Sequence, residues 1–171
     1  MVEGHKRSSH EHRKDLAGEY KYGDTGQIVL LIVFVIGMLL DLFLLKLSGS
    51  WQELFPWYLR IVLFIPILII AGYFAQKAHK KVFEEERKEL VLINTDIFAR
   101  TRHPMYFGSI LLYLSVVILS SSVIALLIFV VVVIFYYYLC SYEEKLLIER
   151  LGDEYMNYKK NVPMLFPKLR K

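Results

Sequence analysis

Two long apolar runs separated by three serines occupy residues 102–144, RHPMYFGSILLYLSVVILSSSVIALLIFVVVVIFYYYLCSYEE. Residues 104–120 and 122–142 are each close to the roughly 20 mostly apolar residues that cross a membrane as a helix. The break Ser120-Ser121-Ser122 is too short to hold a loop away from the bilayer. The stretch therefore predicts a tight antiparallel hairpin of two transmembrane helices. Because the first run is short and contains serine, a re-entrant or tilted helix is the alternative for residues 104–120.

Two further apolar segments precede this hairpin, at residues 27–47 and 57–77. The chain is 56% apolar and its mean hydropathy is +0.40, which is more apolar than an ordinary soluble domain. After residue 142 an apolar stripe at helical spacing continues past Gly152, where one helix is expected to end and a second to begin with Asp153 as its N-cap. The sequence thus predicts an all-α integral membrane protein with about four transmembrane helices and cytoplasmic C-terminal helices.

The distribution of basic residues predicts the orientation. Lys and Arg concentrate in the polar N-terminal segment, between the second and third apolar segments, and in the C-terminal tail. Cytoplasmic loops carry such an excess, so both termini and residues 77–103 are predicted to be cytoplasmic. The net charge of +4 then reflects topology and contact with anionic lipid, and nothing in the sequence suggests a nucleic-acid partner. We divide the chain into a polar N-terminal segment (1–24), two transmembrane helices (25–82) and a C-terminal core (83–171).

Other polar residues are expected to be structural. Cys140 is the single cysteine, and His5, His10 and His12 stand in the polar head without a partner cluster, so no metal site is expected. Asp41 is the one acidic residue in the first apolar segment. Because it lies toward the outer leaflet, far from the residues considered next, we expect it to pack or to form hydrogen bonds.

Ionisable side chains stand at both points where the predicted hairpin leaves the membrane, and an antiparallel hairpin brings them to one cytoplasmic rim. They are Arg102, His103 and Tyr106 before the first helix, and Glu143 and Glu144 at the end of the second. The positive end of the first helix dipole suits an anionic group, whereas two carboxylates suit an amine or other cation. The rim is therefore predicted to bind an amino-acid-like zwitterion. The alternative is a solvated rim of opposite charges.

Four motifs occur in a specific order and spacing: Arg102 to Gly108 (RHPMYFG), Glu143-Glu144, Leu151 to Tyr158 (LGDEYMNY), and Val162-Pro163 with Pro167. In this combination they resemble the isoprenylcysteine carboxyl methyltransferase family, whose wider group includes phospholipid N-methyltransferases. The resemblance covers roughly residues 83–167. It implies a methyltransferase core over residues 83–171, with S-adenosylmethionine as methyl donor and S-adenosylhomocysteine as product.

The resemblance also implies roles for individual residues. Glu143 would hold the ammonium of the donor, Arg102 would meet a carboxylate, and Glu144 or His103 would serve as the base for an amine acceptor. Arg102 and Glu144 are thus the candidate catalytic residues. The implied cofactor-binding residues are Leu90, Val91, Leu92, Ile93, Phe98, His103, Pro104, Met105, Tyr106 and Glu143.

Two departures from the family pattern bear on the acceptor. Asp96-Ile97-Phe98 stands where many members have Gly-Pro-Tyr, and Leu139 stands where animal members have a substrate-contacting arginine. The favoured acceptor is a lipid-like molecule, the carboxylate of a prenylated cysteine or an analogue. The alternatives are a phospholipid amine, an NADPH-dependent enzyme similar to sterol reductases, and a non-catalytic membrane protein that keeps the fold.

Overall fold

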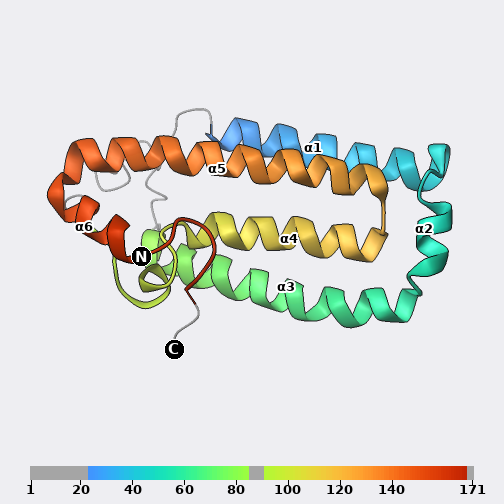
Figure 1. The fold of residues 1–171 in the computed structure, drawn as a ribbon, viewed down its shortest axis with the longest axis horizontal. Helices are drawn as coiled ribbons and strands as arrows, with labels where there is room; N and C mark the ends of the chain where they lie inside the picture. The colour runs from blue at the N-terminus through green and yellow to red at the C-terminus, as the bar shows by residue number, and fades with distance from the viewer. Residues whose placement is uncertain (1–22, 85–90, 169–171) are drawn as a thin grey trace, which may run out of the picture.

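The protein is a bundle of helices that lie side by side (Figure 1). The computed structural model describes residues 23–84 and 91–168, without the side chains of residues 83 and 84. Within these ranges the chain is helical and contains no strand, which confirms the predicted all-α class. The elements are α1 (Gly23–Leu40) with a π-helical turn (Asp41–Leu45), α2 (Gly49–Leu54), α3 (Trp57–His79) with a second π-helical turn (Lys80–Glu84), a 3-10 turn (Asp96–Ala99), α4 (Pro104–Ser120), α5 (Val123–Leu151) and α6 (Asp153–Asn161).

Three helical segments in the described ranges are long and apolar enough to cross a membrane: Gly23–Leu45, Trp57–Val82 and Val123–Leu151. The fourth helix, α4, has 17 residues. At 1.5 Å per residue it extends about 25 Å, somewhat less than the ~30 Å hydrocarbon core. Figure 1 shows it lying along α3 and α5 as a continuous rod, which favours a short membrane helix over a re-entrant one. The chain is a multi-pass membrane protein.

The bundle consists of two closely packed helix pairs, α3 with α4 and α1 with α5 (Figure 1). At Gly108 of α4, a Cβ would lie 3.0 Å from the carbonyl oxygen of Ala71 and 3.1 Å from the amide nitrogen of Ala75. At Gly37 of α1, a Cβ would lie 2.5 Å from Cδ1 of Ile128. Small residues let membrane helices approach in this way, where no hydrophobic effect drives them together. Tyr113 of α4 packs edge-on against Phe34 of α1 and joins the pairs.

The predicted hairpin is present, and its turn is built from the serines. Ser121 follows α4 in the left-handed conformation with φ of 47°. Ser122 is the N-cap of α5, and its hydroxyl accepts a hydrogen bond from the amide of Ala125 at 3.1 Å. We call this end of the bundle the serine end. The opposite end, where α4 begins and α5 ends, is the polar end.

At the polar end, α5 continues without a break to Leu151, whereas the predicted transmembrane segment ended at residue 142. Gly152 separates it from α6 with φ of 55°, a conformation that favours glycine. The predicted break at Gly152 is therefore confirmed. The predicted N-cap is wrong, since Gly152 is itself the N-cap and Asp153 is the first residue of α6.

Candidate active site

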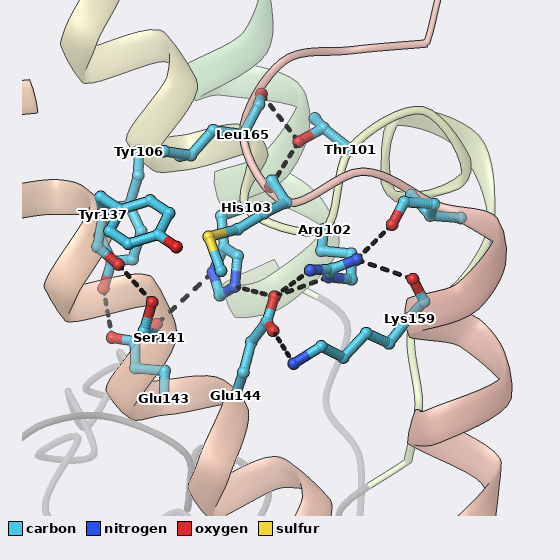
Figure 2. A network of polar contacts seen from close by, with 12 residues as sticks. Thr101, Arg102, His103, Tyr106, Tyr137, Ser141, Glu143, Glu144, Lys159 and Leu165 are labelled. Atoms are coloured by element: carbon cyan, nitrogen blue, oxygen red, sulfur yellow. Dashed lines mark hydrogen bonds and ion pairs between the residues drawn. The ribbon is translucent and has the colours of Figure 1, made fainter.

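The residues predicted to meet across the hairpin do meet, at the polar end (Figure 2). Pro104 occupies the first turn of α4, where its missing N–H costs nothing, and His103 is the N-cap. The 29 residues of α5 bring Glu143 and Glu144 back to the same level. The two glutamates are 9% and 1% exposed, so their charges need partners inside the protein.

Arg102 is the first partner of Glu144. Its Nε donates to Oε1 of Glu144 at 2.6 Å, and Nη2 lies 2.6 Å from the same oxygen. Nη1 donates to the backbone carbonyls of Lys159, at 3.0 Å, and Val162. The planar guanidinium therefore uses all three of its nitrogens within the protein.

Lys159 of α6 is the second partner of Glu144, with Nζ 2.9 Å from Oε2. Its side chain is 41% exposed, which makes it the most accessible member of the group. The sequence analysis did not identify this residue. Two adjacent buried carboxylates need a second cation, and this need could have indicated a lysine. The tail contains several lysines, however, and their spacing does not single out Lys159.

His103 lies between the two glutamates. Its Nδ1 is 3.7 Å from Oε2 of Glu143, and its Nε2 is 3.5 Å from Oε1 of Glu144. Nε2 is buried and makes no well-aligned hydrogen bond to a described residue. Burial lowers the pKa of His103 below the usual 6.5, and the neighbouring Glu144 offsets this only in part. The imidazole is therefore neutral at pH 7.

Tyr106 connects the imidazole to Glu143. Its phenol donates a hydrogen bond to Oε1 of Glu143, and its ring stacks on that of His103 with 5.8 Å between centroids and 15° between planes. The ring also contacts Tyr136 of α5, at 5.3 Å between centroids. Glu143 is thus oriented by a phenol and an imidazole, whereas Glu144 is neutralised by two cations.

The remaining predicted cofactor-binding residues that the structure describes lie outside this network. Leu90 falls outside the described residues. Val91 is exposed, and Leu92 and Ile93 are half-buried; none of the three belongs to the network in Figure 2. Met105 and Phe98 pack against the small apolar cluster formed by Phe74, Ala78 and Ile97.

The two departures from the family pattern have structural counterparts. Asp96, at the position of the family glycine, has φ of 57°, a left-handed conformation that glycine adopts more readily. Its carboxylate lies 3.4 Å from Nζ of Lys77. Leu139 is 4% exposed and belongs to the main apolar core. No cation stands at that position of α5.

Comparison with known families supports the resemblance. The sequence profile described as phospholipid methyltransferase matches residues 58–154, more than half of the chain and from α3 to the start of α6. The chain belongs to the phospholipid methyltransferase family. The match extends further toward the N-terminus than the motifs did, since it includes α3. A search of curated proteins found no match.

Membership in the phospholipid methyltransferase family makes the chain a membrane methyltransferase and implies S-adenosylmethionine as its methyl donor. The chemistry of the cluster fits this donor. Glu143 is a buried carboxylate that Tyr106 and His103 orient, which suits an ammonium, and His103 carries a buried nitrogen that makes no well-aligned hydrogen bond to a described residue. In the described ranges, no group of three or more His, Cys, Asp or Glu side chains is placed to hold a metal ion.

Proposed function

We propose that this protein transfers the methyl group of S-adenosylmethionine to a lipid-like acceptor at the cytoplasmic face of a membrane. The observation that carries this proposal is the imidazole of His103 held between Glu143 and Glu144 at the mouth of the α4–α5 hairpin. Glu143 binds the ammonium of the donor. His103, Pro104 and Tyr106 shape the site around it, and Met105 with the segment from Val91 to Phe98 supplies apolar surface beside it.

The bound donor supplies an electrophilic methyl group on a sulfonium. Held at Glu143, this group would take up a lone pair of the acceptor by in-line displacement, and S-adenosylhomocysteine would leave with the sulfur bonding pair. The protein contributes alignment and exclusion of water, for which intramolecular reactions indicate about 7–11 kcal/mol. The buried positions of His103 and Glu143 provide both.

An amine-bearing lipid fits the charges of the cluster best. Both cations of the cluster, Arg102 and Lys159, already contact Glu144, so neither is placed to receive an acceptor carboxylate. An ammonium acceptor must lose a proton before it attacks. The neutral imidazole of His103 is the base for this step, since its lowered pKa keeps it unprotonated at pH 7.

The second candidate acceptor is the carboxylate of a prenylated cysteine or an analogue. The motifs around Arg102 and Glu143 favour it, because they resemble those of isoprenylcysteine carboxyl methyltransferases. A carboxylate is nucleophilic at neutral pH and needs no base. Leu139 argues against it, since the arginine of animal members is replaced by a buried apolar side chain.

The basic residues favour a cytoplasmic location of the polar end. In the described ranges, the segments there carry Lys77, Lys80, Arg100, Lys160 and Lys168 in addition to the cluster. By the positive-inside rule the polar end, both termini and residues 77–103 face the cytoplasm. The donor therefore enters from the cytoplasm and the lipid acceptor from the membrane. Residues 25–82 act as the membrane anchor, and residues 83–171 as the catalytic core.

The test is methyl transfer by protein purified in detergent. Radiolabelled S-adenosylmethionine is offered with lipids that bear primary amines and, separately, with prenyl-cysteine analogues. We expect a base-stable labelled lipid, and His103→Ala should abolish its formation while the control Lys160→Ala retains it. A base-labile product indicates an ester and the second candidate. Wild-type protein that neither binds the donor at millimolar concentration nor labels any acceptor would refute the proposal.

A further inference from the structure

The C-terminal segment Val162–Lys168 lies against the residues that precede α4. The amides of Arg102 and His103 donate to the carbonyls of Pro163 and Met164, at 3.0 and 3.1 Å. The amide of Lys168 donates to the carbonyl of Arg100 at 2.9 Å. These bonds form a short ladder that joins the end of the chain to the entrance of the site.

Side chains extend this ladder. The hydroxyl of Thr101, which is fully buried, lies 2.9 and 3.0 Å from the carbonyls of Met164 and Leu165 (Figure 2). Nη1 of Arg102 reaches the carbonyls of Lys159 and Val162. Buried carbonyls that lose such donors are costly, so the segment and residues 100–103 stabilise each other.

We propose that Arg102 and Glu144 are positioning residues, which dock the C-terminal segment and hold His103 against Glu143 without touching either substrate. All three guanidinium nitrogens of Arg102 already contact groups of the protein, and its side chain is 6% exposed. The oxygen of Glu144 that it holds is also the one 3.5 Å from Nε2 of His103. One carboxylate thus fixes both the arginine and the imidazole that follows it in the chain. The role of the pair in donor binding rests on the proposed function.

This assignment differs from the sequence-based one, in which Arg102 met a carboxylate and Glu144 served as a base. The two assignments make different predictions for Thr101, whose hydroxyl contacts the docked segment and none of the charged groups of the cluster. Thr101→Val removes the hydroxyl at nearly constant volume, whereas Thr101→Ser keeps the hydroxyl and serves as its control.

The experiment compares Thr101→Val, Thr101→Ser, Arg102→Lys and Glu144→Gln in full-length protein in detergent. We expect Arg102→Lys and Glu144→Gln to weaken S-adenosylmethionine binding at least about tenfold, since lysine lacks the planar fork and glutamine lacks the charge. Thr101→Val should weaken it about fivefold, the equivalent of one hydrogen bond. Thr101→Ser should match wild type. The KM for the acceptor should remain unchanged in all four variants.

A second measurement needs no donor. Trypsin cleavage after Lys168, at the end of the docked segment, should become faster in Thr101→Val, Arg102→Lys and Glu144→Gln, and stay at the wild-type rate in Thr101→Ser. This pattern supports docking even in a protein that binds no donor, an outcome that would reject only the proposed function. A raised acceptor KM in Arg102→Lys, with donor affinity and cleavage rate unchanged, would show that Arg102 contacts the acceptor and would overturn the proposal. Circular dichroism should confirm that each variant keeps its helix content.

Discussion

The two ends of α5 both hold buried carboxylates, but they satisfy them with different groups. At the serine end, Asp41 is fully buried and accepts hydrogen bonds from the hydroxyls of Ser48 and Ser122 and from the amide of Ile124. No described cation pairs with it. At the polar end, Glu143 and Glu144 are surrounded by a guanidinium, an ammonium, an imidazole and a phenol.

This contrast separates a structural carboxylate from a functional one in a membrane protein. Asp41 holds the first turn of α5 and the chain before α2 in place, and dipoles alone are enough because the positive end of a helix faces it. The polar end contains more ionisable groups than are needed to satisfy the backbone groups of its two helix ends. A buried cluster with such additional charges and a neutral histidine indicates a binding site.

The largest expected effect comes from Glu143→Gln at the polar end. The amide keeps the shape and accepts the hydrogen bond of Tyr106, but it removes the charge that we propose binds the ammonium of the donor. We expect kcat/KM to fall at least about 100-fold, or about 2.7 kcal/mol, with little change in the free energy of unfolding. Methyl transfer and thermal unfolding in detergent measure the two. If Glu143→Gln kept half of the wild-type activity, the functional difference between the carboxylates of the two ends would not hold.

Asp41→Ala tests the serine end and should give the opposite result. The hydroxyls of Ser48 and Ser122 lose their acceptor in a buried place, which costs about 1–3 kcal/mol of unfolding free energy. Activity per folded molecule should stay at the wild-type level, since the residue lies at the far end of the bundle. Asp41→Asn, which keeps one oxygen, should lose less stability. Loss of activity in a fully folded Asp41→Ala protein would contradict a purely structural role.

The sequence was sufficient for features that depend on local pattern. Apolar runs and the serine break gave the hairpin, and the hairpin alone brought His103 to Glu143. The partners of Asp41 could not be predicted from the sequence, because Ser122 follows it by 81 positions and pairs with it only through the packing of α1 on α5. The same holds for Lys159 and the C-terminal segment. The sequence placed helices there but could not give the angle at Gly152 that turns α6 toward Glu144.

The dependence of stability on pH should also differ between the ends. Burial lowers the pKa of His103 in the folded protein below 6.5, so the unfolded chain binds its proton more readily. The contribution of His103 to the free energy of unfolding is therefore fully present above pH 6.5. It falls as the pH drops below 6.5, by up to about 1.4 kcal/mol per pH unit. His103→Gln should lack this component, and Asp41→Ala should retain it. Unfolding free energies at pH 7 and pH 5.5 measure it, and identical slopes in wild type and His103→Gln would disprove it.

The smallest effect is expected for Lys159→Ala. This variant measures how much the exposed ammonium of Lys159 contributes to donor affinity at the polar end. Its side chain is 41% exposed, and ion pairs in such places contribute about 0.2–1 kcal/mol. Because Arg102 still contacts Glu144, we expect a less than fivefold loss of donor affinity, and less still at high salt. Lys160→Ala, the exposed neighbour, is the matched control and should change nothing. A loss as large as that of Glu143→Gln would mean that Lys159 contacts a substrate, and the distinction between the oriented Glu143 and the neutralised Glu144 would then fail.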